Sequence, residues 1–291
     1  MYYGLFKKIK DELAKCLKIE SEISSVKNVS GGCINQCFEF VFAEKKFFLK
    51  INSIRKFPGM FAAEEKGLRL LTNASPLRVP LPLINGESGD HQYLVLSYLE
   101  KSLADENYFS LLGNGLALLH KNSSADFGLD LDNFIGALPQ KNSSYLTFTD
   151  FFIHNRIEFQ LKMAVNSHRL EKKWARNAEV LFSELPAIIP SEKPALLHGD
   201  LWSGNVMCTV NGPAVFDPAV YYGHRESDIA MTLLFGGFPA SFYNAYENEF
   251  PLQKNWKERT EIFNLYPLLV HLNLFGAAYL SQIESCLRKF S

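Results

Sequence analysis

The chain has 291 residues, enough for one large domain or two ordinary ones with a substantial core. Hydrophobic residues make up 47% of it and charged residues 21%, a balance typical of globular proteins. The net charge of −1 gives no electrostatic reason to expect nucleic acid or a membrane surface as a partner. No stretch reaches the roughly 18 apolar residues of a membrane span, and charges come too early in residues 1–10 for a signal peptide. We therefore expect a soluble, cytoplasmic protein.

The cysteines are odd in number and lack the CxxC spacing of metal sites. They are Cys16, Cys33, Cys37, Cys208 and Cys286. This pattern excludes a regular disulfide framework and a zinc site, so most of these residues are interpreted as reduced, small apolar side chains.

The first hundred residues are predicted to be rich in strands. An amphipathic helix over 6–17 comes first. Strands over 37–42 and 46–51 are close enough to form a hairpin. Pro58 is expected to open a helix that ends near Asn73, because proline suits a first helical turn. A buried strand over 93–99 follows.

The remainder is predicted to be mainly helical. Leucines over 111–119 indicate a helix, and a polar stretch at 126–144 separates it from a second helical pattern at 148–170. Helical patterning with many aromatic residues predominates from residue 222 onward.

This order predicts an α+β, bilobal fold. The small β-rich lobe would comprise residues 1–98 and the larger, mainly helical lobe residues 99–291, with the break near Ser97–Lys101.

The segment His198–Asn205 carries the strongest chemical motif. Asp200 follows His198 by two residues, and Asn205 follows Asp200 by five, which is the spacing of a kinase catalytic loop. In that arrangement the Asp accepts the proton of the attacking hydroxyl and the Asn holds a magnesium ion. Asp217, at the end of an apolar run, supplies the second acid that such a metal site needs. A single His-x-Asp is usually an ordinary loop, but the joint pattern favours phosphoryl transfer with ATP and Mg²⁺.

A lysine in the small lobe should neutralise the phosphates. Lys50 lies in an apolar strand, where a charged side chain requires an acidic partner. Glu64, in the helix opened by Pro58, is the expected partner, and Glu65 is the alternative. Without the catalytic loop, Lys50 would be interpreted as a strand-edge residue.

Gly31 and Gly32 lie in the expected turn between the first two strands. Glycines allow backbone N–H groups to approach phosphate oxygens closely. A pair of glycines alone is weak evidence, but its position ahead of Lys50 favours a phosphate-binding loop that ends with Cys33.

The sequence as a whole resembles the fructosamine kinase (ketosamine 3-kinase) family, which is related to aminoglycoside and choline kinases. The resemblance implies that the bilobal fold is protein-kinase-like. The segments that carry the resemblance are 31–34, 196–206, 216–231, 234–238 and 271–276. The combination of Asp-Leu-Trp-Ser-Gly-Asn with Gly-His-Arg-Glu-x-Asp is specific to this family.

The resemblance implies roles for individual residues. Asp200 corresponds to the catalytic Asp, Asn205 and Asp217 to the magnesium ligands, and Lys50 with Glu64 to the phosphate-binding pair. It also implies an adenine-binding hinge that includes Ser97 and Leu99, and a brace for the catalytic loop at Asp228, which is otherwise a helix N-terminal charge. Further candidates that face the substrate or support the loop are His198, Trp202, His224 and Arg225.

One position departs from the family. Phe148 stands where a Trp is usual, in a segment expected near the substrate, so the identity of the sugar or amine is open.

The implied reaction is transfer of the γ-phosphoryl group of ATP to the 3-hydroxyl of a fructosamine or ribulosamine, on a free amine or a protein lysine. Such a kinase acts in deglycation. The alternatives are an aminoglycoside or choline kinase, an inactive kinase fold used as a scaffold, and a metal hydrolase. The complete set of Asp, Asn, Asp and Lys argues against the scaffold, and the lack of a full ligand set argues against the hydrolase.

Cys33 also carries a regulatory hypothesis. An electropositive loop lowers the pKa of a thiol and raises its reactivity. A reactive thiol can form a disulfide with a second copy of the chain. We therefore expect either a monomer or a redox-linked homodimer, and the alternative is that Cys33 is inert.

Overall fold

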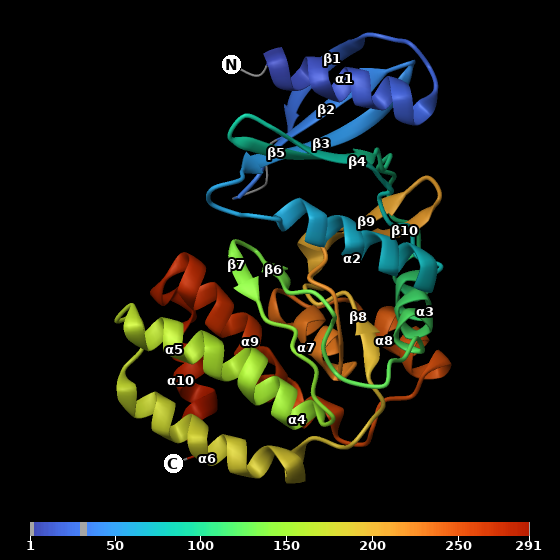
Figure 1. Cartoon of the computed structure of the whole chain (residues 1–291). Coiled ribbons are helices and arrows are strands. Elements are labelled where there is room, and N and C mark those ends of the chain that lie inside the picture. The colour runs from blue at the N-terminus through green and yellow to red at the C-terminus, as the bar shows by residue number, and fades with distance from the viewer. Residues whose placement is uncertain (1–2, 30–33, 291) are drawn as a thin grey trace.

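The computed structural model describes residues 3–29 and 34–290. It contains a small lobe built around a sheet and a larger, mainly helical lobe, as Figure 1 shows. The α+β class and the bilobal arrangement are confirmed. The division between residues 98 and 99 stays a prediction.

The small lobe contains one antiparallel sheet with the strand order β1-β2-β3-β5-β4. Its strands are β1 (Ile23–Val29), β2 (Gln36–Phe42), β3 (Lys45–Ser53), β4 (Pro82–Ser88) and β5 (His91–Ser97). The expected hairpin is present, with Cys37 opposite Lys50. Its turn has φ 48° at Ala43 and 62° at Glu44, as two-residue hairpins require.

Two helices flank this sheet. Helix α1 (Tyr3–Leu17) buries Ile9 and Leu13 in a core shared with sheet residues such as Phe40. Helix α2 (Met60–Ala74) lies between the sheet and the large lobe (Figure 1). It begins two residues after Pro58, because Gly59 has a left-handed φ of 73° that an α-helix cannot contain.

The large lobe is mainly helical. Its helices are α3 (Tyr108–His120), α4 (Phe148–Phe151), a π-helix (Phe152–Ile157), α5 (Glu158–Asn166), α6 (Lys172–Ile188), α7 (Glu226–Leu234), α8 (Ala240–Glu249), α9 (Trp256–Phe275) and α10 (Leu280–Arg288). The helix expected over 148–170 is thus three consecutive helical segments that end at residue 166. Helix α6 was not predicted from the sequence.

Short strands support the loops of the large lobe. They form three two-stranded pairs: β6 (Asn133–Ile135) with β7 (Leu138–Gln140), β8 (Ala195–Leu197) with β11 (Tyr221–Gly223), and β9 (Val206–Thr209) with β10 (Gly212–Val215). The polar stretch at 126–144 therefore contains the β6–β7 hairpin.

One hydrophobic cluster joins the two lobes. It includes Leu68 of α2 and Leu94 of β5 together with Leu112 of α3 and Phe242 of α8. Within the described ranges, none of the helices has the length and apolar character needed to span a bilayer.

Candidate active site

Two adjacent loops bring the predicted acidic residues together. The loop 198–205 connects β8 to β9, and Asp217 lies in the connection from β10 to β11. Because β8 pairs with β11 and β9 with β10, both loops are fixed at their two ends. The N–H of Phe216 donates to the carbonyl of Asn205 at 3.1 Å and joins the loops directly.

Asn205 holds Asp200 in place. Its Nδ2 donates to the backbone O and to Oδ2 of Asp200, each at 2.9 Å. The amide nitrogen is therefore directed at Asp200. The Oδ1 atom of Asn205 remains available as a ligand for a cation.

The surroundings of Asp200 favour its protonated form. Burial raises the pKa of its carboxyl to about 7, and the charges of Asp217 and Asp228 act in the same direction against the hydrogen bond from Asn205. A carboxyl with a pKa near neutrality is well matched to proton transfer.

Lys50 joins the two lobes. Its Nζ lies 2.6 Å from Oε1 of Glu64 and 2.6 Å from Oδ1 of Asp217. Burial works against the ammonium charge, but these two carboxylates raise the pKa of Lys50 above its usual range, so it remains protonated. Glu65, the alternative partner, instead contacts Arg69 and Asn85.

Asp217 has a strained backbone, with φ 54°. Half of its side chain is exposed, and one oxygen binds Lys50 while Oδ2 is not engaged by a described residue. Strain of this kind concentrates at functional sites. The oxygens of Asp217 and Asn205 suit Mg²⁺, which prefers oxygen ligands and usually takes one or two protein groups together with phosphates and water. Among the described residues, no group of three or more His, Cys, Asp or Glu forms a cage for a metal.

The side chains of His198 and Asp228 are buried beneath the loop 198–205. Nδ1 of His198 accepts from the N–H of Asp200 at 3.3 Å, so Nε2 donates to the carbonyl of Phe216 at 3.1 Å. Asp228 accepts from the N–H groups of His198 at 2.7 Å and of Gly199 at 2.9 Å. Both side chains are buried and hold the loop from inside.

Gly199 has no space for a side chain. Its φ is +81°, and a Cβ atom would lie 2.0 Å from the carbonyl oxygen of Ala219. The N–H of Ala219 in turn donates to the carbonyl of His198 at 2.9 Å.

Only some of the residues expected to bind the nucleotide lie within the part of the chain that the structure describes. The N–H of Ser97 donates to the carbonyl of Leu81 and its Oγ accepts from the N–H of Leu81, at 2.8 Å each, so the N–H of Ser97 is not offered to adenine. Leu99 lies just after β5 and is half-buried. Gly31, Gly32 and Cys33 lie outside the described residues.

Trp202, within the loop 198–205, is 36% exposed. Its ring meets Phe235 edge-on with the centroids 5.9 Å apart, and it covers Gly204, where a Cβ would lie 2.4 Å from the indole.

His224 and Arg225, which were expected to face the substrate or tether the loop, are buried in the large lobe. Nε2 of His224 binds the carbonyl of Pro190 at 3.2 Å. Arg225 forms two hydrogen bonds with Glu192, at 2.8 and 2.9 Å, and further bonds to the carbonyls of Phe250 and Pro251. Neither side chain has surface to offer a substrate.

Phe148 is also a core residue. It is 6% exposed and stacks on Phe152 with a centroid distance of 5.3 Å. It contacts Phe127 and His224 as well. The side chain of Phe148 is therefore a packing residue with almost no exposed surface, and the expectation that its segment lies near the substrate stays a prediction.

The hairpin β6–β7 contributes residues that the sequence did not assign to this site. Asn133 donates to the carbonyl of Val220 at 2.8 Å, and Gln140 donates to that of Ala219 at 2.9 Å. Tyr266 fixes Gln140 through a 2.7 Å bond. Asn133 and Gln140 hold the segment after Asp217, but each is 79 or more positions away in the sequence from the carbonyl that it binds, so no local pattern could identify them.

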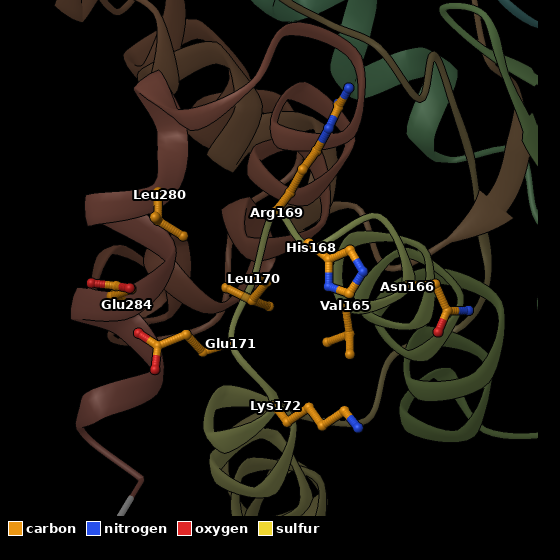
Figure 2. A pocket seen from close by; sticks show the side chains of 9 residues that line it. All are labelled: Val165, Asn166, His168, Arg169, Leu170, Glu171, Lys172, Leu280 and Glu284. Carbon is orange, nitrogen blue, oxygen red and sulfur yellow. The ribbon is translucent and has the colours of Figure 1, made fainter.

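A separate hollow of about 530 Å³ lies between the end of α5, the start of α6 and α10. Figure 2 shows Glu171 and Glu284 at its edge and Arg169 directed away from it. The carboxylates already bind Lys173 and the indole of Trp174, respectively. None of the predicted catalytic residues lines this hollow.

The fold and the two loops define a class of protein. The chain superposes on an aminoglycoside phosphotransferase with a TM-score of 0.60 at 19% identity, covering 96% of this chain and 98% of the other, which shows a shared protein-kinase-like fold. It superposes with a TM-score of 0.90 on a crystal structure assigned as a fructosamine-3-kinase of Haemophilus somnus, at 29% identity and 99% coverage of both chains.

The family model described as fructosamine kinase matches residues 5–291, and the chain belongs to this family of kinases. A probable ketoamine kinase of Synechocystis is 40% identical, over 92% of this chain and 90% of the relative. A chloroplastic protein-ribulosamine 3-kinase of Arabidopsis thaliana is 35% identical, over 91% of this chain and 82% of the relative. The resemblance found in the sequence is confirmed.

Proposed function

We propose that this kinase transfers the γ-phosphoryl group of ATP, with Mg²⁺, to the 3-hydroxyl of a fructosamine or ribulosamine. The observation that carries the proposal is the convergence of Lys50 from the small lobe with Asp200, Asn205 and Asp217 from the large lobe. The names of the ketoamine and ribulosamine kinases to which the chain is similar support the acceptor.

Each residue has a distinct part in the proposed reaction. Asp200 orients the acceptor hydroxyl and receives its proton, while the hydroxyl oxygen bonds to the γ-phosphorus and the bond from that phosphorus to the bridging oxygen of ADP breaks. Lys50 presents a buried positive charge to the phosphates. Asn205 and Asp217 would hold Mg²⁺, which supplies neutralisation of phosphate charge.

The biological consequence would be deglycation, because phosphorylation at this hydroxyl leads the ketosamine adduct to decompose. The acceptor is then a ketosamine on a free amine or on a protein lysine. Trp202, exposed next to Asp200, is a candidate contact for the sugar or for the amine substituent.

Product analysis with a panel of acceptors tests this function. The purified protein with ATP and Mg²⁺ should phosphorylate ribulose-lysine or fructose-lysine far faster than free fructose, choline or kanamycin, and ³¹P NMR should place the phosphate on the 3-hydroxyl. Faster turnover of kanamycin or choline would instead favour the alternative, an aminoglycoside or choline type of kinase.

A further inference from the structure

A buried histidine connects three helices behind the catalytic loop. His120, the last residue of α3, binds Tyr246 of α8 through Nδ1 at 2.7 Å and Asp228 of α7 through Nε2 at 3.2 Å. The side chain of His120 is fully buried, and that of Asp228 is 2% exposed. Both ring nitrogens are thus engaged inside the protein.

The direction of each hydrogen bond follows from Asp228, because a carboxylate can only accept. Nε2 of His120 therefore carries a proton and donates to Oδ2 of Asp228. In this tautomer Nδ1 of His120 accepts from the hydroxyl of Tyr246.

Asp228 connects this chain of bonds to the catalytic loop. Its Oδ2 accepts from His120 and from the N–H of His198, and its Oδ1 accepts from the N–H of Gly199. A carboxylate that receives three hydrogen bonds is held in one orientation. That orientation fixes the N–H groups of His198 and Gly199, the two residues that precede Asp200.

We infer that Tyr246 and His120 form a relay that orients the Asp228 carboxylate, and that His120 is a positioning residue for Asp200. The inference rests on the proposed function only in using Asp200 as the residue that the relay places.

Substitutions at His120 separate positioning from packing. His120→Met fills a similar volume without a donor, whereas His120→Gln keeps an N–H that can reach Asp228. We expect His120→Met to lower kcat on the best ketosamine by about tenfold to 100-fold while KM for ATP and acceptor changes less than about threefold. His120→Gln should recover kcat to within about fivefold of the parent, and Tyr246→Phe should fall between the two.

Hydrogen exchange by mass spectrometry provides a readout that does not depend on catalysis. The amides of residues 196–205 should exchange faster in His120→Met, while those of β3 remain unchanged. Gln160→Met is a matched control, because Gln160 is equally buried and pairs with Asn273 at 2.8 Å outside this relay. It should leave kcat and the exchange of residues 196–205 unchanged.

Equal kcat values for His120→Met and His120→Gln, or the same loss in Gln160→Met, would show that His120 only fills space and would overturn the inference. Unaltered exchange in residues 196–205 would overturn it as well. If His120→Met does not fold, Tyr246→Phe decides: parental kcat and exchange would refute the relay. A parent inactive on every ketosamine would refute the proposed function alone, since the exchange comparison still tests the relay.

Discussion

Lys50 illustrates how charge is managed at a single residue in this site. A buried ammonium without a partner would be costly, and here two carboxylates lie 2.6 Å from it. One of these carboxylates, on Asp217, belongs to the other lobe, so the residue that would neutralise phosphate also connects the lobes. The sequence predicted both the lysine and Glu64, because an apolar strand makes an acidic partner necessary.

Asp200→Asn keeps the size of the side chain and removes the proton acceptor. We expect turnover of the best ketosamine to fall by about 10²–10⁴-fold, the usual contribution of a positioned base, with ATP affinity within a few-fold of the parent. Steady-state kinetics and calorimetric titration with ATP measure the two quantities. Asp130→Asn, at an exposed acid paired with Lys66, is the control and should retain full activity. A loss smaller than tenfold would remove Asp200 from the catalytic role.

Some residues could not be placed from the sequence. Asp200, Asn205 and Asp217 were found because they follow one another at short, fixed spacings. His120 and Tyr246 are 126 positions apart and meet only after α3 and α8 pack. Arg225 belongs to a recognisable motif, but the direction of its side chain is decided by tertiary packing, which placed it in the core, and the same holds for Phe148.

At the scale of elements, the β2–β3 hairpin was predicted, whereas strand β4, the β6–β7 hairpin and the start of α2 were not. The β2–β3 hairpin followed from two apolar runs and a short turn, whereas α2 starts later than Pro58 suggested because of the conformation of Gly59. The contact between α3 and α8 brings His120 to Tyr246, and it depends on Gly113. A Cβ atom there would lie 2.2 Å from the carbonyl oxygen of Phe242.

Gly113→Ala should therefore push α8 away from α3. Alanine favours a helix by up to about 1 kcal/mol relative to glycine, but overpacking against backbone typically costs about 1–3 kcal/mol, so we expect a lower free energy of unfolding. Gly4→Ala in α1 is the matched control, since a Cβ there meets no atom within 4 Å. Urea denaturation compares the two. Equal or higher stability of Gly113→Ala would show that α3 and α8 are not in close contact.

At the scale of the whole molecule, one hydrophobic cluster includes residues of both lobes, so we expect the lobes to unfold together. The global stability then depends on groups buried far from the catalytic loop. His224 is such a group: burial lowers its pKa from 6.5 to about 4, although Glu192 opposes the shift.

The sign of the resulting pH dependence can be worked out. Between pH 6.5 and about 4, His224 is neutral in the folded protein but protonated in the unfolded chain, so acid favours unfolding and stability falls as the pH falls. From pH 7 to pH 5 the contribution of His224 to the loss of stability is roughly 2 kcal/mol.

Urea denaturation at both pH values should show a smaller decrease in the free energy of unfolding in His224→Gln than in the parent, because glutamine can donate to Pro190 but does not titrate. His168→Asn, at an exposed histidine, should keep the parental decrease. A parental decrease in His224→Gln as well would assign the acid sensitivity to other buried groups, such as His198, whose pKa burial also lowers.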